Sequence, residues 1–293
     1  MSAIESGLQA TSAGLRPCTS GQVTHIRPSR GLFDLGLPSI WRYRGLLATL
    51  VKRDVLVLYR QAALGAAWAV IQPVLSVAIF TFIFGRVAKL PTTGGAPYPV
   101  FAFAAVLPWT YFSECVRRGA LGLVTEAELI RKVYFPRLLI PLSAAIAPLV
   151  DLAIGCVVLL AVMLLYGVAP TWRLLALPPL ALVAGLLGLS VALWLGPINV
   201  RFRDVKHTLP FMLQIWMYAS PVVYAFSMIP DRWKPLYALN PMVGVIEGFR
   251  WAVLGAGRPD LGAMAIGTGV FLALLGGGLV FFRRMERSFA DLI

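Results

Sequence analysis

Residue patterns that could catalyse a reaction are scarce in this chain. No Gly-Lys pair occurs among its 293 residues, so the phosphate-cradling motif GxxxxGK followed by Ser or Thr is absent. The HExxH and GxSxG motifs of metalloproteases and serine hydrolases are absent too. The histidines and cysteines lie singly, without the spacing of metal ligands: His25, His207, Cys18, Cys115 and Cys156. We therefore expect neither a catalytic residue nor a metal site in this chain.

Two acidic side chains lie within or beside long apolar runs. Asp151 is near the middle of one run, where an ionisable group is costly and is a candidate for function. The alternative is a hydrogen-bonded or protonated acid that holds helices together. Glu114 lies close to Arg117 and Arg118, so a local ion pair at the level of the lipid head groups is the simpler interpretation.

The composition indicates a membrane protein. Apolar residues make up 59% of the chain and charged residues 13%, whereas soluble proteins have about half and about a quarter. The mean hydropathy is +0.79. The net charge is +13, but the cations separate apolar runs instead of lining one face. They therefore indicate membrane topology and contact with anionic lipid, and not nucleic-acid binding.

Six apolar runs are long enough to cross a bilayer, which predicts an all-α polytopic membrane protein. The runs are Leu64–Gly85, Tyr98–Val116, Leu138–Tyr166, Leu174–Val200, Leu209–Phe226 and Leu261–Phe282. Six crossings place both termini on one side of the membrane. Most cations lie in the connections on that side and in the N-terminal segment, so the positive-inside rule predicts cytoplasmic termini.

The segments around these runs have different characters. Residues 1–40 are expected to form a polar cytoplasmic tail, because they lack the apolar core of a signal peptide. Residues 41–62 are predicted to form an amphipathic helix in the cytoplasmic interface, residues 63–287 the transmembrane domain, and residues 288–293 a cytoplasmic C-terminus. The apolar face of the interface helix is Tyr43, Leu47, Leu50, Val51 and Leu58. Asp54 falls within that face and requires a cation to cover it.

A short helix is expected on the outer side, between the fifth and sixth runs. Asn240 followed by Pro241 is typical of an N-cap with proline at the first helical position, and Gly255 can end the helix. Glu247 and Arg250 make the helix too charged to cross the bilayer. We interpret it as a re-entrant or surface element whose ends need protein or water as partners.

A charged segment follows the second run. Thr125 and Glu128 fit the capping box, which predicts a helix that begins at Glu126. Pro136 disfavours helical geometry at Phe135, so the helix should last about two turns.

Two interpretations of this segment are open. Its apolar face is Leu129, Ile130 and Val133, and its charged face is Glu126, Glu128, Arg131 and Lys132. A solvated loop whose cations fix the orientation is one interpretation. The other is a docking knob for a cytoplasmic partner, with Tyr134 and Phe135 as buried anchors.

Five sequence blocks occur in an order and at a spacing typical of one family. The blocks are LGAAWAVIQPVLSVAIFTFIFGRVAKL (64–90), PYPVFAFAAVLPWTYFSE (97–114), ELIRKVYFPRLLIPLS (128–143), NVRFRDVKH (199–207) and SPVVYAFSMIPDRWKPLYALNPMVGVIEGFRWAVLG (220–255). Together they resemble the permease subunit of polysaccharide-exporting ABC transporters of the ABC-2 type, which handle O-antigen, capsule and teichoic acid chains. The resemblance covers about Leu46 to Arg287.

The resemblance implies a homodimer of six-span subunits in the bacterial inner membrane, working with two copies of a separate ATP-binding subunit. That partner would bind ATP and Mg²⁺, so no cofactor is expected in this chain. The charged segment would be the coupling helix that docks on the partner: Glu126, Glu128, Leu129, Arg131, Lys132, Tyr134, Phe135 and Arg137. The helix from Asn240 to Gly255 would be the outer gate helix, with Asn240, Pro241, Glu247 and Arg250.

Two further groups of residues could contact a polysaccharide linked to polyprenyl diphosphate. Aromatic rings offer flat apolar faces and polar tips that suit sliding sugar rings, although interface belts and packing are the alternative. The candidates are Trp109, Tyr111, Phe112, Tyr218 and Tyr224. Cytoplasmic cations could attract the diphosphate, with orientation and lipid anchoring as the alternative. They are Arg42, Arg44, Arg53, Arg60, Arg201 and Arg203.

Three other functions stay open at this point. A permease of the same superfamily could export a drug or a lipid. A membrane-embedded enzyme acting on polyprenyl-linked sugars would need an acidic pair or a base at the cytoplasmic face, where only Glu114 and Asp204 are available. Transport driven by an ion gradient would run through Asp151.

Overall fold

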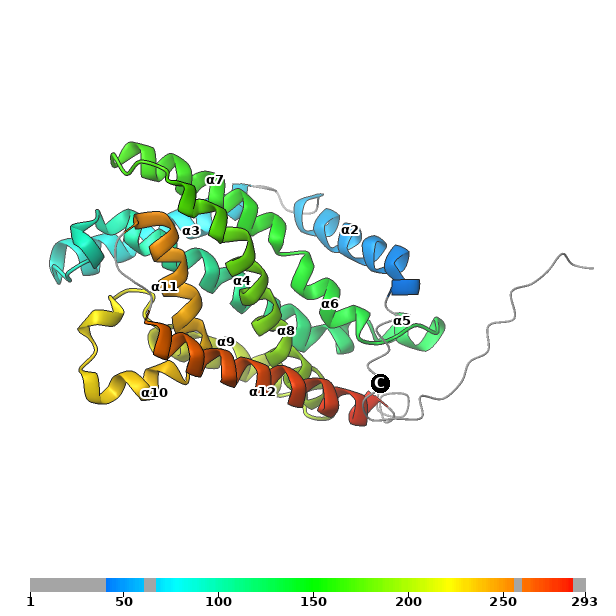
Figure 1. Cartoon of the computed structure of the whole chain (residues 1–293). Helices are drawn as coiled ribbons and strands as arrows, with labels where there is room; N and C mark the ends of the chain where they lie inside the picture. The colour runs from blue at the N-terminus through cyan, green and yellow to red at the C-terminus, as the bar shows by residue number, and fades with distance from the viewer. Residues whose placement is uncertain (1–40, 61–66, 256–259, 287–293) are drawn as a thin grey trace, which may run out of the picture. The chain divides into compact units, whose positions relative to one another are not determined.

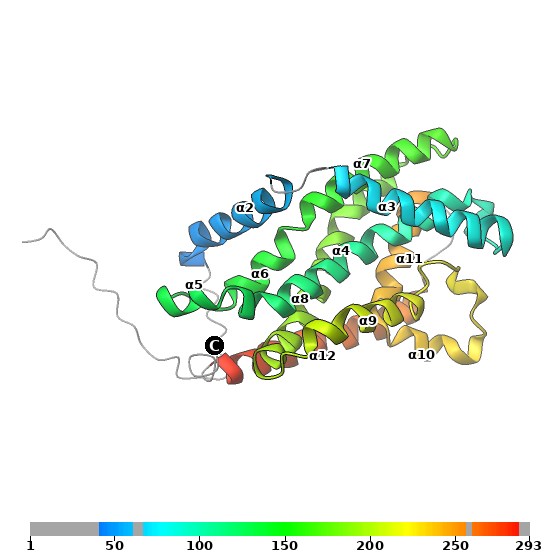
Figure 2. The ribbon, with the colours of Figure 1, turned by 180° about the vertical axis from the view of Figure 1, so that it is seen from behind.

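The computed structural model of the chain describes residues 41–60, 67–255 and 260–286. All regular elements in these ranges are helical (Figures 1 and 2). This agrees with the predicted all-α class. The predicted tails, residues 1–40 and 288–293, lie outside the described residues.

The elements follow one another along the chain as α-helices joined by short 3-10 and π segments. The α-helices are α2 (Arg44–Arg60), α3 (Ala67–Phe80), α4 (Tyr98–Thr125), α5 (Ala127–Lys132), α6 (Leu139–Ile146), α7 (Leu149–Leu165), α8 (Leu177–Arg201), α9 (Val205–Tyr218), α10 (Lys234–Ala238), α11 (Pro241–Leu254) and α12 (Leu261–Glu286). The other segments are the π-helix η2 (Thr81–Val87) and the 3-10 helices η3 (Thr93–Gly95), η4 (Trp172–Ala176), η5 (Phe226–Met228) and η6 (Asp231–Trp233).

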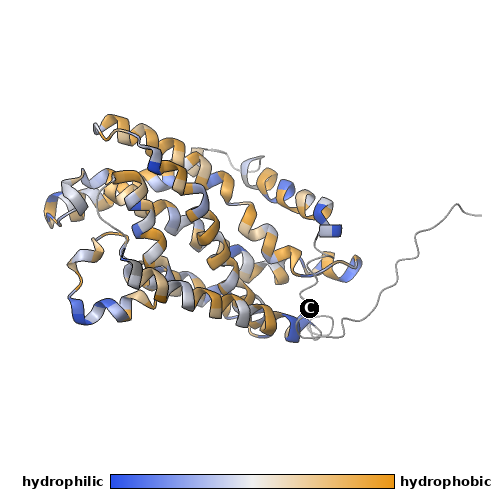
Figure 3. Ribbon diagram, in the orientation of Figure 1, coloured by the Kyte–Doolittle hydropathy of each residue, from blue (hydrophilic) through white to orange (hydrophobic). Residues whose placement is uncertain are grey.

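Five helical segments in the described part of the chain are long and apolar enough to cross a membrane. They are Ala67–Val87, Tyr98–Thr125, Leu139–Leu165, Trp172–Arg201 and Gly262–Glu286. These segments correspond to the first four and the sixth of the predicted runs. Figure 3 shows apolar residues along most of their length, and hydrophilic residues at the ends of α2, α5 and α12.

The fifth predicted run, Leu209–Phe226, is not one continuous helix. Helix α9 has 14 residues, which at a rise of 1.5 Å per residue reach about 21 Å, less than the thickness of a hydrocarbon core. Pro221 explains why the helix ends at Tyr218, because proline has no backbone N–H to donate to the preceding turn. Residues 219–225 form turns and bends instead.

Two other runs differ from the prediction in extent. The second continues past Val116 to Thr125, so α4 is a 28-residue helix. The third is divided, because α6 ends at Ile146 and α7 begins at Leu149, with Pro148 between them. Proline again removes a helical hydrogen bond at the break.

Helix α4 lies at the centre of the described helices. Its residues from Val100 to Trp109 are all buried, and α3, α6, α7, α8 and α11 pack against it (Figures 1 and 2). Glycine allows α4 and α8 to approach closely: a Cβ on Gly119 would lie 2.5 Å from the Ala192 Cβ, and one on Gly188 would lie 2.6 Å from the Cys115 Cβ. Small residues at such crossings are typical of helix packing in membranes.

Helix α2 lies within the segment predicted to form an amphipathic helix, residues 41–62. Leu50 is buried, and Tyr43, Leu47 and Val51 are partly buried, while Lys52 is exposed. The helix packs against α6. Asp54 has the cation that its position requires, because Arg53 donates to its carboxylate at 2.8 and 3.1 Å.

Candidate functional site

The charged segment 126–137 lies at one end of the described helices, beside the C-terminal end of α12 (Figures 1 and 2). Arg137 joins these parts directly, because its guanidinium donates to the backbone carbonyl of Glu286. A short helix at this position projects beyond the long helices, which suits contact with a second protein.

The predicted capping box at the start of this segment is wrong. Thr125 is the last residue of α4, and its hydroxyl donates backwards to the carbonyl of Leu121 over 3.2 Å. Helix α5 starts at Ala127 and ends at Lys132, and the N-cap residue Glu126 makes no side-chain cap. The helix is therefore shorter than the predicted two turns.

The carboxylate of Glu126 binds Arg53 of α2 instead of the backbone. The two guanidinium nitrogens Nη1 and Nη2 lie 2.8 and 2.7 Å from its two oxygens, a bidentate pair. The hydrogen bonds to Glu126 are the main reason that the pKa of Arg53 lies above the usual arginine value; burial opposes them. The pair joins the interface helix to the junction of α4 and α5, although the two residues are 73 positions apart.

We expect this pair to be coupled by about 1 kcal/mol, near the top of the range for partly exposed ion pairs, because it is bidentate. The side chains of Arg53 and Glu126 are 42% and 20% exposed, so solvent screens part of the attraction. The measurement is a double-mutant cycle of Arg53→Gln and Glu126→Gln, read as thermal unfolding of the purified chain in detergent. Additive single effects would contradict the coupling.

A control cycle uses the neighbouring pair of Glu128 and Lys132, which lie 3.0 Å apart on the outer face of α5. Both side chains are largely exposed. Their coupling should not exceed about 0.5 kcal/mol.

The exposed face of α5 and the residues after it is both charged and aromatic. Glu128, Arg131 and Lys132 are exposed, and Tyr134 is 72% exposed. Phe135 is only 5% exposed and packs in the apolar core of its own chain. Of the two aromatic residues predicted as anchors, Tyr134 is therefore the one whose ring a partner could bury.

The helix predicted between the fifth and sixth runs is α11, and its ends are as predicted. The side-chain oxygen of Asn240 accepts a hydrogen bond from the backbone N–H of Met242 over 3.1 Å, with Pro241 at the first helical position. Gly255 ends the helix in the left-handed conformation, at φ 66°. Asn240 also accepts a hydrogen bond from the indole of Trp216 in α9 over 3.1 Å.

Helix α11 is packed inside the chain, against α4, α8 and α12. Arg250 is 1% exposed, and its guanidinium carbon lies 3.7 Å from the centre of the Phe101 ring. Its terminal nitrogens donate to the carbonyls of Val222 and Tyr224, at 2.9 and 3.0 Å, and to Glu247 at 2.9 Å. Arg250 thus holds the turn after α9 against α11.

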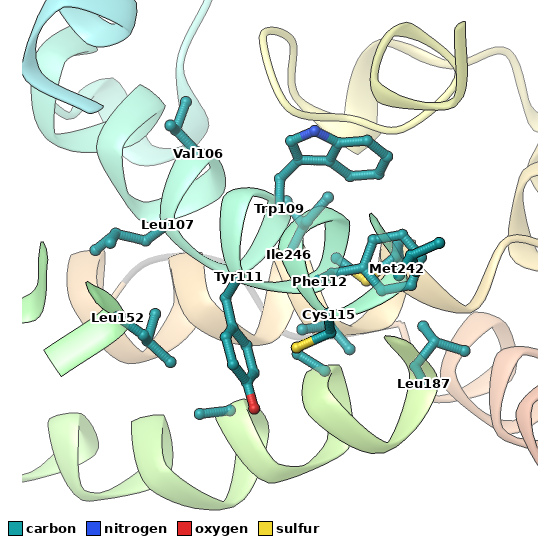
Figure 4. Close-up of a cluster of buried hydrophobic side chains, with 14 of the residues drawn as sticks. Val106, Leu107, Trp109, Tyr111, Phe112, Cys115, Leu152, Leu187, Met242 and Ile246 are labelled. Carbon is teal, nitrogen blue, oxygen red and sulfur yellow. The ribbon is translucent and has the colours of Figure 1, made fainter. Parts of the chain in front are cut away.

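The predicted conduit aromatics lie in two places. Trp109, Tyr111 and Phe112 are buried on α4; Figure 4 shows Tyr111 pointing toward α8 and Phe112 lying beside Met242. Tyr111 donates to the carbonyl of Ala145 over 3.0 Å. Each of these three rings is at most 5% exposed and so offers little surface to a sliding polymer, although Tyr111 also borders a cavity.

The other two aromatics are less buried, although Tyr224 packs against the core. Tyr218 is half-exposed at the end of α9. The hydroxyl of Tyr224 lies 3.1 Å from the carbonyl of Tyr218 and 3.2 Å from the hydroxyl of Tyr237. Tyr218 and Tyr224 are therefore the candidates with ring surface outside the core.

The acidic residues inside the apolar runs have partners. Glu114 accepts hydrogen bonds from Arg117 and Arg118 at 2.6 to 2.9 Å, which confirms the predicted local ion pair. Asp151 accepts the hydroxyl of Tyr59 in α2 over 2.5 Å. This hydrogen bond agrees with the interpretation of Asp151 as an acid that joins helices. No local sequence pattern indicates Tyr59 as its partner.

The cations proposed to bind a diphosphate differ in their exposure and in whether an acidic side chain already pairs with them. Arg53 is bound by Glu126 and Asp54. Arg42, Arg44, Arg201 and Arg203 are exposed, and Arg60 is not described beyond its backbone. Exposed cations at helix ends suit contact with lipid head groups as well as with a substrate.

A comparison of the sequence with protein families matches residues 45–254 to the family described as ABC-2 type transporter. This chain belongs to the ABC-2 type transporter family. The matched range runs from the start of α2 to the end of α11, so it includes α5 and also Arg250 with the residues that it contacts. An ABC-2 chain with several apolar spans is a multi-pass membrane protein and a transport component.

Curated relatives match the chain over most of its length. The O-antigen export system permease protein RfbA of Myxococcus xanthus is 30% identical over 256 residues, 87% of this chain and 97% of the relative. RfbA of Klebsiella pneumoniae is 26% identical over 85% of this chain and 95% of the relative. The polysialic acid transport protein KpsM of Escherichia coli is 24% identical over 80% and 92%.

Proposed function

We propose that this chain is the membrane-spanning permease subunit of an ATP-driven exporter that moves lipid-linked polysaccharide across the bacterial inner membrane. The observation that carries the proposal is the near full-length similarity to permeases named for two different polymers, O-antigen and polysialic acid. A separate subunit supplies ATP hydrolysis and binds ATP and Mg²⁺, because this sequence has no phosphate-cradling motif.

The proposed topology has six crossings and two cytoplasmic termini, in a homodimer. Helix α9 is the short fifth crossing, and α11 is the outer gate helix, which enters and leaves from the outer side. The burial of α11 and the partners of Arg250 support this proposal, since a re-entrant helix must have its polar groups satisfied by protein. Tyr218 and Tyr224 are the aromatic residues that we propose for the conduit.

Helix α5 is the proposed coupling helix, which transmits movement of the ATP-binding subunit to α4 and α6. Its exposed charges set the register of docking, and Tyr134 supplies a ring that the partner buries. Aromatic anchors surrounded by charges are typical of protein interfaces.

The test is co-purification of the ATP-binding subunit with the tagged chain from its native membrane. Reversing two cations, with Arg131→Glu and Lys132→Glu together, should reduce the co-purified subunit and its ATPase activity by at least about tenfold, since like charges at an interface cost several kcal/mol. The matched control reverses Arg232 in η6 and Lys234 at the start of α10, which lies away from α5 at the other end of the described helices. This control should leave the complex intact.

Two outcomes would count against the proposal in different ways. An intact complex after the double reversal in α5 would show that the partner docks elsewhere. A wild-type chain that carries no ATPase, even after crosslinking in the membrane, would overturn the exporter function itself.

A further inference from the structure

A cavity of about 440 Å³ lies where four elements meet: the end of α2, the start of α3, the middle of α4 and the start of α7. Leu107, Pro73 and Leu152 form part of its wall. The rest is unusually polar for a place among membrane spans, because two arginines and two acids line it. Charged groups among such spans are costly, so a bound ligand that forms hydrogen bonds with them would lower the free energy of the site.

The cationic part of the wall has more hydrogen-bond donors than the chain uses. A guanidinium carries five N–H donors. Arg118 donates from Nε to Glu114 over 2.6 Å, and its two terminal amino groups have no partner among the described residues. Arg117 donates from Nε and one terminal amino group, also to Glu114. Most donors of Arg118 and several of Arg117 therefore remain open.

Among the described residues, the acids of the wall do not use up these donors. Glu114 already accepts three hydrogen bonds from the two arginines. Asp151 accepts the hydroxyl of Tyr59, and no cation covers it in the described part of the chain. The cavity thus has one wall of open cationic donors and another with a carboxylate that can accept a hydroxyl.

Access to the cavity comes from the surface of the chain. The side chain of Arg117 is 48% exposed and that of Arg118 is 19% exposed. Trp68 and Gln72 of α3 lie on the same wall, and the ring of Trp68 is half-exposed. A head group could enter beside α3, while the lipid chain attached to it stays in the bilayer.

We infer that this cavity binds the diphosphate head of a lipid-linked sugar, with a phosphate on Arg118 and Arg117 and a hydroxyl of the adjoining sugar toward Asp151. Guanidinium groups pair with phosphate oxygens in a fork geometry, and a carboxylate suits a hydroxyl donor. A diphosphate joined to a sugar presents both kinds of group side by side. The inference rests on the proposed export of a lipid-linked polymer, and it assigns the substrate to cations other than those in the connecting segments.

The test measures binding of polyprenyl diphosphate to the full-length chain in phosphatidylcholine nanodiscs, by quenching of tryptophan fluorescence. Arg118→Gln should weaken binding at least about tenfold, the usual effect of losing a charged hydrogen bond, and Arg118→Lys should recover part of the loss. Arg117→Gln gives a second variant at a more exposed position. The matched control Arg232→Gln, at an exposed cation outside the cavity, should bind as the wild type does.

Three results would overturn the inference. Undiminished binding to correctly folded Arg118→Gln and Arg117→Gln is the first, and a loss confined to Arg44→Gln or Arg203→Gln is the second. Equal displacement of the probe by phosphatidylglycerol is the third, because it would show a general site for anionic lipid. The site would be supported if free inorganic diphosphate displaces the lipid from the wild-type chain but not from the variants. That result would show that the head group provides the binding energy.

The same preparations separate this inference from the proposed function. If the wild-type chain binds its ATP-binding subunit and the complex hydrolyses ATP, but polyprenyl diphosphate does not bind through Arg118, the cavity assignment fails and the exporter function stands. If no ATP-binding subunit assembles, the function fails, whatever the lipid result.

Discussion

Gly119→Ala is expected to lower the unfolding temperature of the purified chain by several degrees, and Ala192→Gly in the same chain is expected to restore it. The added Cβ would lie 2.5 Å from the Cβ of Ala192, where α4 crosses α8. Neither atom belongs to a flexible side-chain end, so the helices themselves must separate. Overpacking of this kind costs about 1–3 kcal/mol.

The second substitution makes this result specific. With Ala192→Gly present, the next atom of α8 near the new Cβ is the Cα of residue 192, at 3.9 Å, an ordinary contact distance. Gly269→Ala is the matched control, because a Cβ there meets nothing within 4 Å. It should be neutral or slightly stabilising, since alanine favours a helix. Equal effects of Gly119→Ala and Gly269→Ala would contradict the close crossing.

Arg250→Met is expected to destabilise the chain by about 3 kcal/mol, because two backbone carbonyls and the partly exposed Glu247 lose a buried donor. Methionine fills much of the same space but cannot donate to Glu247 or to the carbonyls of Val222 and Tyr224. The turn after α9 then loses its attachment to α11. Thermal unfolding in detergent measures the loss of stability, and limited proteolysis of residues 219–225 measures the release of the turn.

Two companions of this variant separate charge from geometry. Arg250→Lys keeps the charge, but a lysine ammonium cannot stack on Phe101 and donate to both carbonyls as the planar guanidinium does. The stability of this variant should therefore lie between those of the wild type and Arg250→Met. Arg232→Met removes an exposed arginine that lies over Trp233, and should change stability by less than about 0.5 kcal/mol. A wild-type unfolding temperature for Arg250→Met would refute the role of Arg250 as a clamp.

The features predicted correctly from the sequence depend on neighbouring residues. Asn240, Pro241 and Gly255 mark the ends of α11 because an N-cap, a first-turn proline and a left-handed glycine are each set by their own backbone position. The apolar face of α2 follows from helical spacing alone. Five of the six long runs also agree in general position, since apolar length decides them.

The features that were missed depend on residues far apart in sequence. Thr125 can cap a helix or continue one, and here it continues α4, whose end is held by the pairing of Glu126 with Arg53 of α2. The sequence cannot distinguish whether apolar rings such as Trp109 and Phe112 face lipid, line a conduit or pack in a core. Their burial follows from contact with Trp216 of α9, at ring distances of 6.5 and 5.1 Å.

The hydrogen-bond partner of Asp151 shows the same limit. No sequence pattern around Tyr59, at the end of α2, indicates that its hydroxyl donates to Asp151. The break at Pro148 brings the first turn of α7 within reach of Tyr59, but a proline in an apolar run indicates a kink without indicating its neighbour.

Helix α2 is fastened at two points, by Arg53 to Glu126 and by Tyr59 to Asp151. The two points are six positions apart, which corresponds to about 9 Å along a helix. A rod held at two points shifts as a whole instead of pivoting about either one. The partner protein that we propose for α5 would therefore act on two predicted membrane spans at once: on α4 through the peptide backbone, and on α7 through α2, which packs against α6.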